Sequence, residues 1–134
     1  MKLTETQLAQ IDTYLAAHRG EIVQTLMELI RIPSVKSEPE PHAPFGENCA
    51  AALEAAHKLY EREGLETKKT DSYVLASYGS GTHTLGVFAH ADVVPVNEAD
   101  WTVCAPFEPV VRDGFVYGRG SDDNKSGVVA SLYA

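Results

Sequence analysis

The stretch HTLGVFAHADVVPV, residues 83–96, decides which class of fold this sequence favours. Its apolar run from Leu85 to Ala89 is continuous rather than alternating, which is typical of a strand buried on both faces. Strands of this kind need helical cover, so the stretch favours an α/β fold with helices packed on a mixed central sheet. At 134 residues the chain has the size of one modest domain, or of a piece of one.

Two helical patterns precede this stretch. In the first, apolar residues recur at helical spacing up to Pro33, either as one long helix or as two helices broken near Gly20. These apolar residues are Leu8, Ile11, Leu15, Ile22, Leu26 and Leu29. The second pattern begins at Cys49 and ends at Gly64, a residue type that suits the left-handed position after a helix C-terminus.

Short strands and one more helix account for much of the remaining chain. Residues 65–70 and 72–78 are rich in strand-forming residues, and residues 109–118 hold two apolar runs around Asp113-Gly114, which predicts a hairpin. Residues 124–134 begin a further helix. If the chain is truncated there, the apolar side chains of that helix have little to pack against, so we expect the fragment to self-associate.

Composition and charge exclude several classes of partner. The formal net charge is -8, and the 11 Lys and Arg residues are scattered, which argues against binding to nucleic acid. No stretch approaches the roughly 20 apolar residues of a membrane span, and the first residues lack the apolar core of a signal peptide. We therefore expect a soluble cytoplasmic protein without a membrane partner. Two isolated cysteines, Cys49 and Cys104, fit reduced thiols better than a disulfide framework.

A histidine and an aspartate stand two residues apart where the apolar run ends. In an extended chain His90 and Asp92 share one face, so both side chains can reach one spot at the carboxyl end of the predicted strand. A nearby carboxylate is how proteins orient a metal-binding imidazole. The alternative is a solvated histidine at a strand end, hydrogen-bonded to a neighbouring acid.

A second group of chemically versatile residues lies in YGRGSDDNKSG, residues 117–127. A phosphate-binding loop is excluded, because Arg119 and Asn124 occupy the positions where that loop needs glycine. A calcium loop at residues 122–133 matches at its first, third, fifth and sixth positions. However, Tyr133 stands where the bidentate glutamate belongs, and a hairpin rather than a helix precedes the loop.

A third interpretation of this stretch is a metal ligand at a tight turn between strand and helix. Gly118 and Gly120 would permit the close backbone approach that such a turn needs, and one of the two adjacent aspartates, Asp122 or Asp123, would be the ligand.

Taken together, four stretches resemble the metallopeptidase family M20. This family includes the dipeptidase PepV, carboxypeptidase G2, acetylornithine deacetylase and succinyl-diaminopimelate desuccinylase. The four stretches are LMELIRIPSV (residues 26–35), FAHADVVPV (88–96), the run from Trp101 to Gly120, and Asp123-Asn124-Lys125. The segment PFGEN, residues 44–48, looks most like the PepV branch.

The resemblance implies a fold and an activity. Residues 1–134 would form the amino-terminal portion of a zinc-exopeptidase-like catalytic domain, with the inserted small domain and the C-terminal part absent. The activity would be metal-dependent hydrolysis of amide bonds in dipeptides, short peptides or N-acyl amino acids. Two zinc ions, with cobalt or manganese as substitutes, would complete the site. The general base and further ligands would lie downstream, so the fragment alone would be inactive. The alternative is a non-catalytic acidic α/β domain with a calcium loop at residues 122–133.

The resemblance also implies roles for individual residues. His90 would bind one zinc ion, and Asp92 would act as the catalytic acid that clamps its imidazole. The family pattern Arg-Gly-x-x-Asp-x-Lys runs here from Arg119 to Lys125, so Asp123 falls on the carboxylate that bridges two metals. A cis peptide bond is expected after Asp123. The sequence departs from the family in placing Ser126 directly after the lysine.

Overall fold

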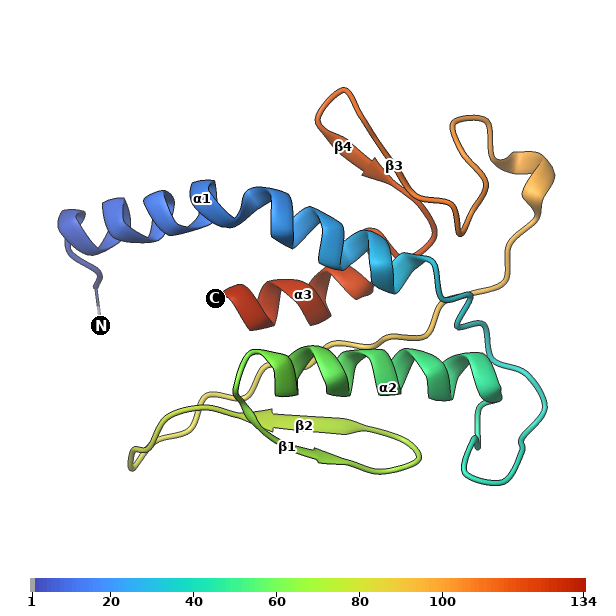
Figure 1. Ribbon diagram of the computed structural model, residues 1–134, viewed down its shortest axis with the longest axis horizontal. Helices are drawn as coiled ribbons and strands as arrows, with labels where there is room; N and C mark the ends of the chain where they lie inside the picture. The colour runs from blue at the N-terminus through green and yellow to red at the C-terminus, as the bar shows by residue number, and fades with distance from the viewer. Residues whose placement is uncertain (1) are drawn as a thin grey trace.

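The computed structural model describes residues 2–134 and contains both helices and strands, as an α/β chain should (Figure 1). In chain order the elements are α1 (Glu5–Ile30), α2 (Glu47–Arg62), β1 (Glu66–Lys69), β2 (Val74–Ser77), the short 3-10 helix η1 (Glu98–Asp100), β3 (Val110–Arg112), β4 (Phe115–Tyr117) and α3 (Lys125–Tyr133). Every predicted helix and hairpin is present, whereas the predicted central strand is not.

The first helical pattern forms one continuous helix. A capping box begins α1: the Thr4 hydroxyl accepts a hydrogen bond from the Gln7 backbone amide at 3.2 Å, and the Gln7 side chain accepts one from the Thr4 amide at 2.9 Å. Gly20 lies on the exposed side of the helix and does not break it. The helix ends at Ile30, just before Pro33, whose ring disfavours helical backbone in the residue before it.

The core lies where α3 packs between α1 and α2 (Figure 1). It is formed by one buried residue of α1, two of α2 and three of α3: Leu29, Ala56, Leu59, Val128, Val129 and Tyr133. The Tyr60 hydroxyl of α2 also donates to the Val128 carbonyl at 3.2 Å. The expectation that the apolar side chains of α3 have little to pack against is therefore wrong, since Val128 and Val129 are 5% and 2% exposed.

Two antiparallel hairpins flank the helices. In the first hairpin, Glu66 of β1 lies opposite Ser77 of β2, and Lys69 lies opposite Val74. Both strands pack on α2. Strands β3 and β4 form a second hairpin, whose turn residues Asp113 and Gly114 have φ values of 51° and 83°. Positive φ at both central residues is the conformation that an Asp-Gly pair adopts in a two-residue hairpin turn.

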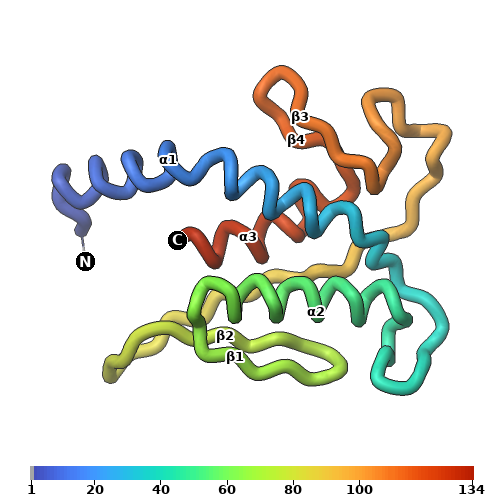
Figure 2. Tube along the Cα trace, viewed as in Figure 1, coloured from blue at the N-terminus to red at the C-terminus, as the bar shows by residue number. Residues whose placement is uncertain are grey.

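The stretch that suggested a buried central strand is extended but unpaired. Residues 83–92 belong to no strand, and beyond them only an isolated parallel bridge joins Val35 to Val93. Leu85 and Phe88 are 89% and 94% exposed. A strand buried on both faces needs helical layers over those faces and neighbouring strands that pair with its edges, and within residues 2–134 the other strands pair with each other in local hairpins. The predicted mixed central sheet is thus absent from the described chain. Figure 2 shows that the chain after β2 runs back across the molecule through residues 83–92.

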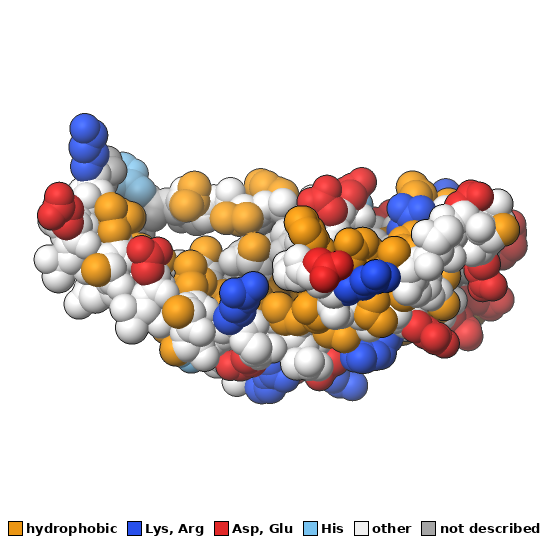
Figure 3. Space-filling view, turned by 90° about the horizontal axis from the view of Figure 1, so that it is seen from above, with side chains coloured by type: hydrophobic (Ala, Val, Ile, Leu, Met, Phe, Trp, Pro, Cys, Tyr) orange, Lys and Arg blue, Asp and Glu red, His pale blue; other side chains and the backbone are white. Residues whose placement is uncertain are grey.

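The surface carries an uneven distribution of acidic side chains. Asp and Glu crowd one end of the face drawn in Figure 3, the end at which the loops following α1 and preceding β3 lie in Figure 1. Among residues 2–134, none of the helices combines the length and the apolar character needed to cross a membrane.

Candidate metal centre

The segment that carries His90 and Asp92 is anchored next to the end of α1. The Ser34 hydroxyl donates to the Ala91 carbonyl at 2.6 Å, and the Val93 amide donates to the Ser34 carbonyl at 3.0 Å. Ser34 is fully buried. These two hydrogen bonds hold residues 91–93 in a defined place, although the apolar residues before them are exposed.

The turn that carries Asp123 depends on two glycines, as predicted. A Cβ atom on Gly118 would lie 2.7 Å from Cγ2 of Ile30, and one on Gly120 would lie 2.9 Å from Cγ1 of Val93. Gly120 also has a φ of 89°, which favours glycine. The missing side chains therefore let the turn approach both the end of α1 and the segment of Asp92.

The backbone after Asp123 has the expected form. The peptide bond between Asp123 and Asn124 is cis. Helix α3 begins one residue later, and Ser126 is accommodated in its first turn, where its hydroxyl donates to the Asp122 carbonyl at 2.6 Å. The departure from the family pattern at Ser126 therefore coexists with the expected cis bond.

The structure brings the three predicted site residues together. Nε2 of His90 lies 2.9 Å from Oδ1 of Asp123, although the two residues are 33 positions apart. The other ring nitrogen, Nδ1, lies 3.1 Å from the main-chain carbonyl oxygen of Asp92 and 3.4 Å from its Oδ1. The imidazole thus lies between two acidic residues, and Asp123 rather than Asp122 faces it.

These contacts contribute little to stability, because the side chains are open to solvent. The side chain of His90 is 47% exposed and that of Asp123 is 82% exposed. Exposed ion pairs are typically worth about 0–1 kcal/mol, since water screens the charges and two side chains must be ordered. The arrangement is therefore better understood as a placement of donor atoms that an ion or a substrate can reach.

The donor atoms of His90 and Asp123 have the chemistry and nearly the spacing of metal ligands. Imidazole nitrogen and carboxylate oxygen are both zinc ligands at about 2.0–2.2 Å, so a tetrahedral ion would hold them roughly 3.3 Å apart. The 2.9 Å between Nε2 and Oδ1 needs only a small opening to reach that spacing. Within residues 2–134, however, no group of three or more His, Cys, Asp or Glu side chains is arranged to hold a metal. The pair fits as part of a metal site.

The calcium-loop alternative is not compatible with the structure. Residues 125–133, which would be positions four to twelve of such a loop, form the helix α3. In addition, the Ser126 hydroxyl donates to the Asp122 carbonyl rather than facing an ion. A loop that wraps a calcium ion cannot also be a helix, so this interpretation of residues 122–133 is wrong.

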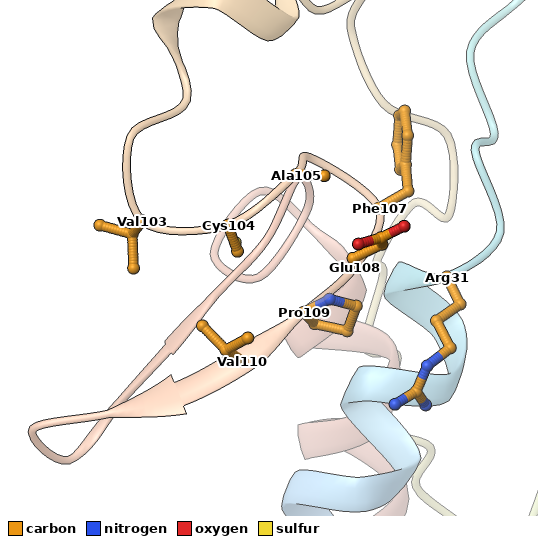
Figure 4. A pocket seen from close by; sticks show the side chains of 8 residues that line it. All are labelled: Arg31, Val103, Cys104, Ala105, Phe107, Glu108, Pro109 and Val110. Atoms are coloured by element: carbon orange, nitrogen blue, oxygen red, sulfur yellow. The ribbon is translucent and has the colours of Figure 1, made fainter.

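A separate open hollow lies beside β3 and is unrelated to His90 and Asp123 (Figure 4). Its lining combines the residue after α1 with the loop before the second hairpin and the first residue of β3: Arg31, Val103, Cys104, Ala105, Phe107, Glu108, Pro109 and Val110. None of the predicted site residues belongs to it. Close to that loop, the Arg119 guanidinium lies 5.3 Å from the ring centroid of Trp101.

Sequence reasoning missed two residues that hold this site. Ser34 carries no signal beyond its position just after Pro33, and its role depends on a partner 57 positions away. Lys125 was visible as part of the Asp-x-Lys pattern, but its contacts with the distant end of α1 were not.

Comparisons with known proteins include the segment that carries this site. Residues 86–134, which include His90, Asp92 and Asp123, match the model of peptidase family M20/M25/M40. The resemblance to the M20 family that four sequence stretches predicted is thereby confirmed. The family match begins within the extended segment and continues through α3.

Among individual proteins, dipeptidases recur. The chain is 37% identical over 119 residues to "Putative dipeptidase YtjP" of Bacillus subtilis (strain 168), covering 87% of this chain and 25% of that protein. It is 32% identical over 120 residues to a "Putative dipeptidase" of Staphylococcus epidermidis, with the same two coverages. The crystal structure of human carnosine dipeptidase 1 superposes with a TM-score of 0.75 and 28% identity, over 93% of this chain and 29% of that one.

The chain therefore spans about a quarter of the length of these curated relatives. The superposition shows that its α/β arrangement is that of part of an M20-type dipeptidase domain, as predicted.

Proposed function

We propose that this chain supplies part of the metal centre of a hydrolase that cleaves amide bonds in dipeptides or short peptides. The observation that carries the proposal is the contact of 2.9 Å between His90 and Asp123. It joins a histidine at the end of the extended segment 83–90 to a carboxylate just before α3, within the region that matches the M20 family.

Each residue of the pair would have a separate role. His90 would bind one metal through Nε2, while Nδ1–H donates to the Asp92 carbonyl oxygen and so fixes the tautomer and ring orientation. Asp123 has two carboxylate oxygens at an open position and would bridge two ions. Asp92, whose carboxylate lies 3.4 Å from Nδ1, would orient the imidazole as the resemblance implies.

Zinc is the metal that we propose, with two ions in a complete site and cobalt or manganese as substitutes. Bound metal would supply polarisation of the amide carbonyl and a water of lowered pKa. The chain's own residues would position the metal ligands. The buried Ser34 holds the segment of Asp92, and Gly118 and Gly120 allow the turn of Asp123 to approach that segment. We also propose that residues 1–134 are the amino-terminal portion of such a catalytic domain, without its inserted small domain.

Dipeptides are the preferred substrate class. Each of the relatives described above is named as a dipeptidase, whereas N-acyl amino acids are supported only by the breadth of the M20 family. The substrate would reach His90 and Asp123 from solvent, to which both side chains are open.

A metal titration of the 134-residue chain tests the proposal. Co²⁺ binding, followed by calorimetry and by visible absorption, should be weakened at least about tenfold by Asp123→Ala and by His90→Ala, since each removes a ligand. Asp122→Ala is the matched control and should bind Co²⁺ as the unaltered chain does. Equal effects of Asp122→Ala and Asp123→Ala would contradict the assignment, as would Co²⁺ binding that survives both His90→Ala and Asp123→Ala.

A further inference from the structure

We propose that Lys125 is a positioning residue that sets the spacing of His90 and Asp123 by tying the first turn of α3 to two carbonyls at the end of α1, one within the helix and one just after it. This inference rests on the proposed function, because His90 and Asp123 are the residues proposed there as metal ligands. It concerns how the donor atoms are held rather than which atoms bind.

Lys125 is a fully buried lysine whose ammonium group ends on backbone oxygens. Nζ donates to the carbonyl of Leu29 at 2.8 Å and to that of Ile32 at 2.6 Å. The side chain has 0% exposure. Burial lowers the pKa of this ammonium group from its usual 10.5 to about 8, because removal from water disfavours the charged form. A group buried at such a cost needs a compensating contact, and the two carbonyls provide it.

The end of α1 receives a donor from elsewhere in addition to its backbone donors, since the Ile32 amide already donates to the Leu29 carbonyl at 3.2 Å. The last carbonyls of a helix lack partners within it, and a positive charge near them is favourable. The last turn of α1 contains no basic residue. Lys125, 96 positions away from Leu29, supplies both the hydrogen bonds and the charge. The helix end and the start of α3 are thereby joined through one side chain.

The same lysine closes the turn that contains Asp123. Its backbone amide donates to the Gly120 carbonyl at 3.1 Å, which joins the two ends of residues 120–125. Its stem also passes close to Gly120, where an added Cβ atom would lie 3.1 Å from Cδ of Lys125. Lys125 thus holds this turn through its backbone and holds α1 through Nζ.

The other half of the site is attached to the same segment of the chain. Ser34, five residues after Leu29, holds the segment of Asp92 through its bonds to Ala91 and Val93. Both halves of the His90–Asp123 pair are therefore fixed to residues 29–34. A change in either attachment changes the distance between the two halves, because no other hydrogen bond or ion pair within residues 2–134 joins residues 83–90 to the turn of Asp123.

The test uses the full 134-residue chain and needs no metal. Lys125→Met keeps a long side chain but removes the donor. The ring signals of His90 are then followed in long-range ¹H–¹⁵N NMR spectra at one fixed pH. Asp123→Ala, which lacks any hydrogen-bonding side chain, marks the spectrum of a broken His90–Asp123 contact. Leu59→Ala is the control for damage to the core, because Leu59 lies on α2, outside residues 29–34 and the turn of Asp123.

Lys125→Met should move the His90 signals most of the way toward those of Asp123→Ala, whereas Leu59→Ala should leave them in place. If Lys125→Met fails to fold, Ser34→Ala should produce a shift in the same direction through the other attachment. Unmoved signals in the folded Lys125→Met chain, or in Ser34→Ala where Lys125→Met is unfolded, would overturn the inference. So would an equal shift in Leu59→Ala.

A parallel Co²⁺ titration separates this inference from the proposed function. If the unaltered chain binds no Co²⁺ but the His90 signals respond as described, the proposed function fails and the positioning role stands. If Co²⁺ binds through His90 and Asp123 with equal affinity in the unaltered chain and in Lys125→Met, the positioning role fails and the proposed function stands.

Discussion

Gly120 illustrates how a missing side chain creates this site. Its φ of 89° disfavours any residue with a Cβ atom, and such an atom would lie 2.9 Å from Val93. Both neighbours that would have to move, Val93 and Lys125, are buried, so neither can give way at low cost.

At the residue scale we therefore predict that Gly120→Ala destabilises the chain by about 2–4 kcal/mol, through backbone strain and overpacking together. Urea unfolding followed by circular dichroism measures this change.

Gly20→Ala provides the control for this substitution. Gly20 lies within α1, is exposed, and has no atom within 4 Å of a built Cβ. Alanine there should stabilise the chain by about 0.5–1 kcal/mol, because alanine has the higher helix propensity. Similar free energies of unfolding for the two variants would contradict the close approach at Gly120.

At the element scale, α2 meets the segment after α1 through a thiol. The Cys49 Sγ–H donates to the Ser34 carbonyl at 3.4 Å, so α2 contacts the residue that also holds the segment of Asp92. Burial raises the pKa of the Cys49 thiol above its usual value of 9.0, and the negative charge of Asp92 adds to this effect. A thiolate at this position is disfavoured in the folded chain.

A pH dependence of stability follows from Cys49. In the unfolded chain the thiol ionises near its usual pKa, while in the folded chain it stays protonated to higher pH. With respect to Cys49 the unfolded state then binds fewer protons, so this thiol lowers the free energy of unfolding as pH rises through about 9. Lys125, whose pKa is lowered to about 8, acts in the opposite direction in both chains. Urea unfolding of the unaltered chain and of Cys49→Ala, between about pH 8 and pH 10, isolates the contribution of the thiol. The stability of Cys49→Ala relative to the unaltered chain should increase across this range, and identical slopes would contradict the prediction.

At the scale of the whole molecule, the packing of the helices differs from that of residues 83–90. The helices share one core, whereas residues 83–90 are exposed and form no backbone hydrogen bond with the rest of residues 2–134. We predict that amides of this segment exchange with solvent almost unprotected, while those of Val128 and Val129 in α3 are the slower ones. Hydrogen-exchange NMR measures both sets. Strong protection at Val87 and Phe88 would show that the segment is paired in solution.

The open site also limits what the chain can do alone. His90 and Asp123 are exposed, and within residues 2–134 no third ligand joins them. We expect the 134-residue chain to hydrolyse no dipeptide in the presence of Zn²⁺, Co²⁺ or Mn²⁺, because two side chains cannot bind and activate a pair of ions. A chromatographic assay of dipeptide cleavage measures this. Turnover that is abolished by a chelator and by Asp123→Ala would contradict the expectation.

Much of the local structure could be predicted from residue types alone. The Asp113-Gly114 hairpin follows from two residues that accept positive φ, and α2 follows from apolar spacing that ends before Gly64. The paired strands β1 and β2 were also predicted. These features depend on neighbours within a few positions, so the sequence pattern contains the information that determines them.

The central strand was wrongly predicted for the converse reason. The apolar run from Leu85 to Ala89 has the composition of a buried strand, but such a strand also needs neighbouring strands to pair with its edges. Within the described chain the remaining strands pair with their sequence neighbours, and the run stays exposed. The composition of a segment indicates whether it can form a strand, whereas pairing depends on which other strands are available.

The sequence by itself determined the helices, the hairpins and the identity of His90, Asp92 and Asp123 as candidates, because turn chemistry, periodicity and the M20 pattern are all local. Only the tertiary structure decided that His90 meets Asp123 across 33 positions and that both are attached to residues 29–34 through Ser34 and Lys125. The two residues in each of these contacts are separated by between 33 and 96 positions in the sequence, and no local pattern specifies such contacts. They arise because burying α3 between α1 and α2 brings a lysine to a helix end whose last turn contains no basic residue.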